Sequence, residues 1–415
     1  MEYMYEKRDS YEDFARGKML LNASGTTAFP VKLASELFLR GRAYLLERTE
    51  YLERIAGSDI DDRVLEIAKI NMSMVNLDGL DRRLGSGVKM TSDGLIFGIY
   101  PFSAAGTPTG LAVGPDDDYE RIQEALQLLR GNKRMLFPRN YLVFSKPNAM
   151  PGLISYANRL LHAGLLGDLV IGWVQTAEID FDEWIACIRQ VVRDYGPYLA
   201  SLQITNEPNL SFMEGSKPYA RQALMEGVIA AKEEARSCGL QMKIGFGSVP
   251  ESSASVPGFW EGLAANPKFI DSVDFVGHNF YVDVFEEPLA LPEVADSVER
   301  IIRNLRKNMA VAGIPGHVPI RVTENGWPTG QNPFTHMERT YDQQSAVLEA
   351  VIRTVYRLRK EYLITHYTLF GLRDADSLKS DLFHQFGIMR DDYAPKPAFA
   401  MYKRLIEELG FEANL

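Results

Sequence analysis

Residues 201–210 read Ser-Leu-Gln-Ile-Thr-Asn-Glu-Pro-Asn-Leu, a short apolar run that ends in a carboxylate and turn-forming residues. Residues 318–327 read Val-Pro-Ile-Arg-Val-Thr-Glu-Asn-Gly-Trp and have the same form. Both runs are too short for a helix and rich in β-branched residues, which predicts two buried strands. Each predicted strand carries a glutamate, Glu207 or Glu324, at its C-terminal end.

Similar apolar runs recur through the second part of the chain and alternate with amphipathic stretches. The strand candidates are residues 95–100, 135–142, 169–174, 199–205, 242–246, 273–279, 320–323 and 364–370. The helix candidates are residues 117–130, 153–162, 181–195, 219–238, 259–263, 294–312, 337–358 and 397–409. This alternation implies parallel pairing through right-handed crossovers, and about eight strand-helix units close a (β/α)8 barrel.

A doubly wound sheet is the alternative for such a chain. That fold ordinarily has a glycine-rich, phosphate-binding turn after its first strand. Residues 100–110 read Tyr-Pro-Phe-Ser-Ala-Ala-Gly-Thr-Pro-Thr-Gly, without the G-x-G-x-x-G spacing or a helix directly after it. The predicted fold class is therefore α/β, with a (β/α)8 TIM barrel over residues 93–415, and no cofactor is expected.

Residues 1–92 have a different pattern, because helical periodicity dominates and convincing strand candidates are missing. Residues 30–46 and 61–74 are amphipathic helix candidates. Two such helices bury too little surface to stand alone, so we expect a helical N-terminal extension packed against the barrel. Its helices are a candidate surface for association of the chain into a homo-oligomer.

The composition is that of a globular protein, with 46% hydrophobic and 24% charged residues. A net charge of −10 opposes binding to nucleic acid or to an anionic membrane through a broad electrostatic surface. The two cysteines, Cys187 and Cys238, lie in helical stretches and are expected to be reduced, packed thiols. The N-terminus lacks an export-signal pattern and no run approaches about 18 apolar residues, so we expect a cytoplasmic protein without a membrane span.

In a (β/α)8 barrel the active site is built at the C-terminal ends of the strands. Polar and aromatic residues gather at those positions in this sequence: Arg139, Asn140, Trp173, Gln175, Asn206, Glu207, His278, Asn279, Tyr281, Glu324, Asn325, Trp327, Phe370, Arg373, Asp374 and Asp376. Two carboxylates on such a rim suit a reaction in which one protonates a leaving group and the other attacks or stabilises a cationic centre. Glycoside hydrolysis fits that requirement best, which makes a carbohydrate the expected partner.

The other rim residues favour the same interpretation. The aromatic faces of Trp173, Trp327, Tyr281 and Phe370 could stack on sugar rings, and the polar side chains, Asn140 among them, could bind hydroxyls. A phosphate site would require a cluster of Lys, Arg or glycine amides. No metal site is expected, because His278 lacks a second His or Cys at ligand spacing.

The residues Thr205-Asn-Glu-Pro208 and Thr323-Glu-Asn-Gly-Trp327 resemble the acid/base and nucleophile motifs of the clan A retaining glycoside hydrolases, a (β/α)8 barrel superfamily. The resemblance covers about residues 94–410 and includes Gly277-His-Asn-Phe-Tyr281. It implies that Glu207 is the acid/base and Glu324 the nucleophile.

The resemblance also implies roles for four neighbouring residues. Asn206 is similar to the Asn that binds the sugar 2-hydroxyl, and Tyr281 to the Tyr that hydrogen-bonds the nucleophile. His278 resembles a substrate-site His, and Arg139 the Arg that helps to keep the nucleophile ionised. Phe370 stands where the clan often has Trp, and residues 1–92 match no clan A module.

The sequence thus predicts a retaining hydrolase of a β-linked glycoside or oligosaccharide. Two alternatives stay open. The same site could transfer the glycosyl unit to another acceptor, as in a transglycosylase. The barrel could also be a non-catalytic carbohydrate-binding module with residues 1–92 as its interaction surface, although a binding module needs neither glutamate.

Overall fold

The structure is a computed structural model that describes residues 94–411, except for 108–109, 132–134, 145–149, 174–179 and 333–334. The helical extension expected over residues 1–92, and the homo-oligomer surface expected on it, lie outside the described residues. Gln175 also lies outside them. The described part begins directly with the first barrel strand.

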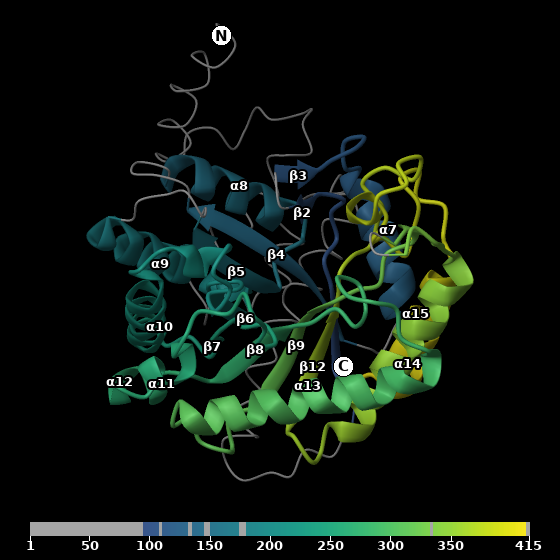
Figure 1. Cartoon of the computed structure of the whole chain (residues 1–415). Helices are drawn as coiled ribbons and strands as arrows, with labels where there is room; N and C mark the ends of the chain where they lie inside the picture. The colour runs from purple at the N-terminus through teal and green to yellow at the C-terminus, as the bar shows by residue number, and fades with distance from the viewer. Residues whose placement is uncertain are drawn as a thin grey trace, which may run out of the picture. The chain divides into compact units, whose positions relative to one another are not determined.

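Eight parallel strands form a closed barrel in the order β1-β12-β9-β8-β7-β6-β5-β4 (Figure 1). Their bounds are β1 Ile96–Ile99, β4 Leu136–Phe144, β5 Asp168–Trp173, β6 Ser201–Ile204, β7 Lys243–Phe246, β8 Phe275–Asn279, β9 Ile320–Asn325 and β12 Ile364–Leu369. Every strand expected from an apolar run is present, and the predicted (β/α)8 fold is confirmed. Helices cover the outside of the barrel, so its strands are buried and read as apolar runs in the sequence.

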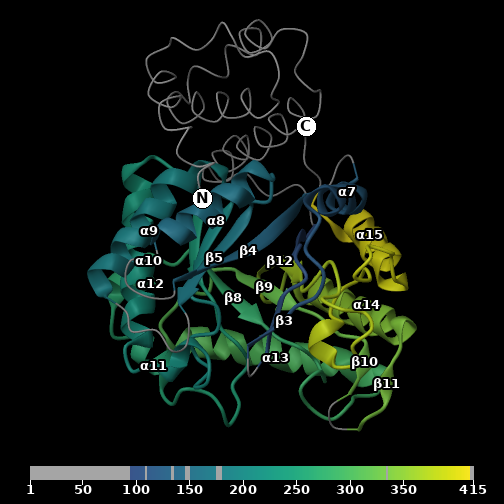
Figure 2. The same cartoon turned by 90° about the horizontal axis from the view of Figure 1, so that it is seen from above.

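Helices surround the barrel, as Figures 1 and 2 show from two directions. They are α7 Tyr119–Arg130, α8 Met150–His162, α9 Phe181–Tyr195, α10 Ala220–Ser237, α11 Phe259–Leu263, α12 Pro267–Ile270, α13 Leu291–Val311, α14 Tyr341–Leu358 and α15 Pro397–Leu409. In the described part of the chain, none of the helices combines the length and apolar character needed to cross a membrane.

Some boundaries differ from the prediction for local reasons. Helix α14 begins at Tyr341 because Thr340 caps it in a capping box with Gln343. The residues just before this cap form the short strand β11 (Glu338–Arg339), which pairs with β10 (Gly330–Gln331). Strand β9 continues to Asn325, so Glu324 is part of the strand and does not follow it.

The cysteine prediction was half right. Cys187 is buried inside α9 and its thiol is free. Cys238 is free but exposed, because it caps the C-terminus of α10 and does not lie on the packed face of the helix.

The inside of the barrel contains a polar network, although barrel interiors are dominated by branched apolar side chains. The guanidinium of Arg139 is fully buried, forms an ion pair with Asp168, and donates to Oε1 of Gln203 over 2.8 Å. Ser201 donates from Oγ to Asp168 over 2.7 Å. These residues lie on three neighbouring strands, β4, β5 and β6, and occupy one inner surface below the rim.

Candidate active site

Glu207 follows strand β6 through a strained turn. Thr205 has a φ of 66°, in the left-handed region that β-branched residues rarely adopt. Its N–H donates to the carbonyl of Ile171 over 2.8 Å, and its carbonyl accepts from Nε2 of Gln203 over 2.9 Å. A Cβ added to Gly247 would lie 2.0 Å from the carbonyl oxygen of Asn206, so the neighbouring strand end needs a glycine there.

A buried glutamate that follows the motif holds the backbone of this turn. Glu214 begins the short 3-10 helix η4 (Glu214–Ser216), and its side chain is 5% exposed. Its carboxylate accepts from the N–H of Asn206 at 3.0 and 2.8 Å and from the N–H of Glu207 at 2.6 Å. The charge is therefore stabilised by backbone amides, as in an anion-binding nest.

Asn279 connects the turn to the opposite strand. Its Nδ2 donates to Oδ1 of Asn206 and to Oε1 of Glu207, each over 3.1 Å. Its Oδ1 accepts from Oγ1 of Thr323 over 2.8 Å. Because Thr323 directly precedes Glu324, this bridge joins the β6 and β9 ends of the site.

Glu324 lies near the end of β9, where its side chain is 6% exposed. The hydroxyl of Tyr141 donates to Oε1 over 2.6 Å, and the hydroxyl of Tyr281 donates to Oε2 over 2.7 Å. Tyr281 thus makes the contact that the resemblance implies. Donors to both oxygens stabilise the negative charge of a carboxylate.

Arg139 reaches Glu324 through Tyr141. Its Nε donates to the hydroxyl of Tyr141 over 3.2 Å, while its terminal nitrogens bind Asp168 and Gln203. The guanidinium therefore orients the tyrosine that holds the carboxylate and adds a buried positive charge on that side of the barrel. Through Gln203, the same guanidinium is connected to the carbonyl of Thr205 and hence to the β6 turn.

The acidities of the groups differ across the site. Burial, the nearby charge of Glu324 and that of Glu214 raise the pKa of Glu207, against the hydrogen bond from Asn279. Burial raises the pKa of Glu214 to about 7, although the amide donors lower it. Burial and the charge of Glu324 also raise the pKa of both tyrosines, Tyr141 and Tyr281, so their hydroxyls stay protonated as donors.

Aromatic side chains form one wall beside Glu324. Phe370 is half-buried and stacks on Tyr100, with ring centroids 4.8 Å apart and planes 2° apart. Tyr281 meets Phe370 edge to face at 6.4 Å, and Tyr141 meets Tyr100 at 5.5 Å. A partly exposed aromatic face next to a carboxylate suits the apolar face of a sugar ring.

Four of the residues expected at the site are turned away from the carboxylates. Asn140 donates to the carbonyl of Leu165 over 2.6 Å, outside the barrel. Trp173 packs edge to face on Trp184 of α9 at 5.5 Å. The strand period explains both positions, because successive residues point to opposite faces and Arg139 and Gly172 face inward.

His278 and Trp327 are also occupied elsewhere. His278 is 2% exposed, its Nδ1 lies 2.8 Å from Oγ of Ser248, and burial lowers its pKa to about 3, so it stays neutral. Trp327 is 5% exposed and donates from its indole N–H to Asp283 over 2.5 Å. The guanidinium of Arg339 covers its ring at 4.6 Å. The hydrogen bonds given above join neither residue to Glu207 or Glu324. That the two residues contact a sugar stays a prediction.

Comparison with solved structures finds the same barrel in glycosidases. A glucosidase from Croceicoccus marinus has a TM-score of 0.52 at 14% identity, over 77% of this chain and 68% of that one. A β-glucosidase from Thermotoga maritima in complex with azafagomine has a TM-score of 0.51 at 15% identity, over 78% and 100%. The chain shares the fold of these enzymes. The described strands form the closed (β/α)8 barrel that the resemblance of the two motifs implies.

Other matches are partial or weak. The chain spans half of a β-glucuronidase from an uncultured Clostridium sp., covering 50% of that chain with 76% of its own length, at 12% identity and a TM-score of 0.48. Residues 1–52 match the family model of the rRNA methyltransferase AviRa, a segment outside the described residues. None of the curated protein sequences matches the chain.

Three site residues were not assigned a role by the sequence. Tyr141 lies two residues after Arg139 on the same inner face, so strand alternation could have found it. Asn279 is among the rim residues expected from the sequence, but its bridge depends on the register between β8 and β9. Glu214 follows Glu207 by seven residues and lies beyond any strand end, so no periodic signal pointed to it.

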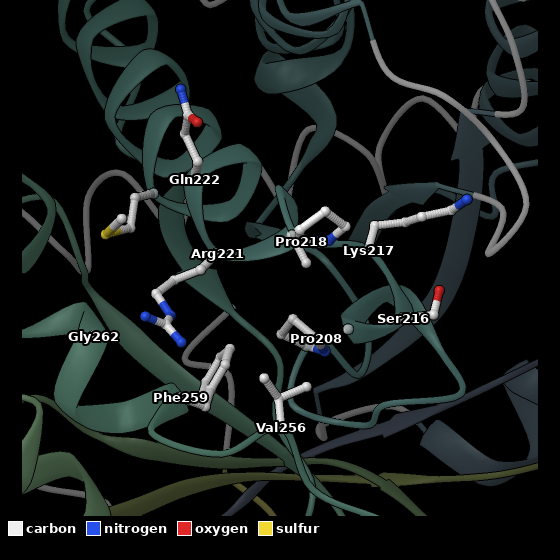
Figure 3. Close-up of a pocket in the computed structure, with 12 residues that line it drawn as sticks. Pro208, Ser216, Lys217, Pro218, Arg221, Gln222, Val256, Phe259 and Gly262 are labelled. Carbon is white, nitrogen blue, oxygen red and sulfur yellow. The ribbon is translucent and has the colours of Figure 1, made fainter.

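Two other kinds of site were considered for the described residues: a metal centre and a hollow near the motif. Within the described ranges, no group of three or more His, Cys, Asp or Glu is arranged to hold a metal ion. A hollow of about 660 Å³ is lined in part by Pro208 of the motif (Figure 3). Its lining contains no carboxylate, and Figure 3 shows Lys217 and Arg221 extending to opposite sides.

Proposed function

We propose that this protein is a retaining glycoside hydrolase that cleaves a β-linked glycoside or oligosaccharide by double displacement. One observation carries the proposal: the barrel rim holds two glutamates in opposite environments. Glu207 has a raised pKa and an amide donor, whereas Glu324 accepts hydroxyl donors on both oxygens. Environments that separate two carboxyl groups in this way assign one as acid and the other as nucleophile.

In the first step Glu207 donates its proton to the glycosidic oxygen while the carboxylate of Glu324 attacks the anomeric carbon. The bond between that carbon and the leaving oxygen breaks as the bond to Glu324 forms, which produces a covalent glycosyl-enzyme. The buried guanidinium of Arg139 and the two tyrosine hydroxyls lie on the side of the site that carries the negative charge of Glu324.

In the second step the carboxylate of Glu207 takes a proton from water, and the water oxygen displaces Glu324 from the anomeric carbon. Two inversions return the original configuration. The loss of the Glu324 charge in the intermediate removes one cause of the raised pKa of Glu207, which favours its change from acid to base. Asn206 stands beside Glu207 with its Oδ1 held by Asn279, a position suited to a sugar hydroxyl.

The test is hydrolysis of a panel of aryl β-glycosides by the wild type and by Glu324→Ala, with proton NMR of the first anomer released. The expected result is cleavage of at least one glycoside with retention, an inactive variant, and rescue by azide that yields a glycosyl azide of inverted configuration. First release of the inverted anomer would contradict the retaining mechanism.

The same panel separates the other functions. Products that grow when an alcohol or sugar acceptor is added would indicate glycosyl transfer at the same site. Absence of cleavage of every glycoside, with oligosaccharide binding retained by Glu324→Ala, would favour a binding module. For a hydrolase, water must be the main acceptor of the glycosyl unit. Glu324→Ala should then lose turnover while it still binds the substrate.

A further inference from the structure

A third carboxylate, Glu214, lies at the barrel rim without a role in the two displacement steps. It faces the inner side of β5, because a Cβ added to Gly172 would lie 2.0 Å from its Oε1. The charge of Glu324 contributes to the raised pKa of Glu214, which places this carboxyl in the same electrostatic field as the proposed nucleophile. Glu214 is therefore part of the site and not of the outer packing.

The contacts of Glu214 are concentrated on the backbone of the acid/base turn. Both oxygens accept from Asn206 N–H, and Oε2 accepts from Glu207 N–H over 2.6 Å. In the described part of the chain, no Lys or Arg forms an ion pair with it. A buried carboxylate with amide donors and no cation is costly to keep for packing alone, since a neutral side chain would avoid the desolvation of the charge.

The turn that Glu214 holds is the strained part of the site. Thr205 lies at a φ of 66°, a conformation that is strained for a β-branched residue and persists only when neighbouring contacts determine it. The carboxylate binds the next two amides and so fixes the direction in which the side chain of Glu207 leaves the backbone.

We propose that Glu214 is a positioning residue for the acid/base, whose carboxylate holds the turn from Thr205 to Glu207 so that Glu207 faces the glycosidic oxygen. This inference rests on the proposed role of Glu207. Glu214 is assigned no bond-making step and acts through the backbone of the turn that carries Asn206 and Glu207. Its own negative charge also contributes to the raised pKa of Glu207, although less than burial and Glu324 do.

The main test is Glu214→Gln, which keeps the size of the side chain and removes the charge. Because hydrogen bonds to a charged group are worth about 10- to 100-fold, we expect kcat/KM to fall by about that factor for aryl glycosides with poor leaving groups. Activated leaving groups need little protonation, so their kcat/KM should stay near the wild-type value. An equal loss for both kinds of substrate would indicate a merely structural role and overturn the proposal.

Three further variants extend the test and control for folding. Glu234→Gln removes another glutamate with low exposure, 9%, which pairs with Arg193 on the outer helices, and should leave the leaving-group dependence unchanged. Gly172→Ala should reproduce the effect of Glu214→Gln without any change of charge, because the new methyl displaces the carboxylate. Its matched control is Gly152→Ala, where an added Cβ meets nothing within 4 Å.

A titration without substrate decides the inference even if the proposed function fails. Carbon-13 NMR of glutamate-labelled protein follows the Glu207 carboxyl, identified as the signal missing from Glu207→Gln. In Glu214→Gln we expect the pKa of Glu207 to be lower than in the wild type. An unchanged pKa overturns the role of Glu214, whereas a wild type that cleaves no glycoside overturns only the proposed hydrolysis.

Discussion

The ends of β6 and β9 present the same side chain in two different ways. Glu324 belongs to strand β9, where the register with both neighbouring strands shifts, and it receives hydroxyl donors on both oxygens, close to a buried guanidinium. Glu207 follows a left-handed residue, and its backbone N–H donates to a second carboxylate, Glu214. One environment stabilises the anion and the other raises the pKa of the carboxyl. The barrel thus separates the two glutamates by the groups around each of them and, for Glu207, by burial.

The largest expected effect comes from removing the carboxylate at the β9 end. Glu324→Ala should lower kcat by about 10⁴-fold or more, because loss of a nucleophile abolishes the covalent route. The loss should be similar for good and poor leaving groups, since no intermediate forms with either. Steady-state kinetics on a series of aryl glycosides measures this, with an unchanged melting temperature as the control. A residual rate that depends on the acidity of the leaving group would contradict the role of Glu324 as the nucleophile.

The β6 end should respond differently to the same truncation. Glu207→Ala should lower the rate by about 10²- to 10⁴-fold for poor leaving groups, the usual contribution of a general acid, and far less for activated ones. Azide should then attack the accumulated glycosyl-enzyme and give a glycosyl azide of retained configuration, opposite to the product from Glu324→Ala. The same azide anomer from both variants would contradict the assignment of roles.

The barrel could be predicted because its signal is local: each strand is an apolar run of the right length between turn formers. The two glutamates could be predicted for the same reason, since each ends such a run. The pattern could not show which residues of each strand face the inside of the barrel. A shift of one residue exchanges inner and outer faces, which is why Asn140 faces outward while Tyr141 lies at the site.

Two further residues depend on contacts between distant parts of the chain. Trp327 has a ring suited to stacking, but Asp283 and Arg339 hold it, and these partners lie 44 and 12 residues away in the sequence. Glu214 is recognisable only once the turn from Thr205 to Glu207 is known to expose two amides to it. Contacts between loops depend on tertiary structure that a periodic pattern does not encode.

An intermediate effect is expected from the hydroxyls that hold Glu324. Tyr281→Phe and Tyr141→Phe should each lower kcat/KM by about 10- to 100-fold, because a hydrogen bond to a charged group contributes about 1.5–3 kcal/mol. Tyr195→Phe is the matched control, since its hydroxyl bonds Ile154 and Asn158 among the outer helices. If either site variant keeps the wild-type kcat/KM, its hydrogen bond does not support the nucleophile.

The smallest expected effect is on stability, and it tests the raised pKa of Glu207 without any substrate. A carboxyl whose pKa is higher in the folded state keeps its proton there while the unfolded chain has already lost it. The folded state then binds more protons, so stability falls as pH rises from the unfolded pKa to the folded one. Glu207→Gln removes this term, and its melting temperature relative to the wild type should therefore increase between about pH 5 and pH 8.

The opposite sign is expected for a carboxylate that the fold stabilises. Hydrogen bonds from Arg357 and Arg303 lower the pKa of Glu299 on α13, so the folded state loses that proton first. Its contribution is present above the unfolded pKa, and Glu299→Gln should lower the melting temperature at pH 7 more than at pH 3. Thermal unfolding of both variants across this range measures the two slopes. If the melting temperatures of Glu207→Gln and the wild type change with pH in parallel, the fold does not hold Glu207 in its protonated form. That result would contradict the assignment of Glu207 as the acid.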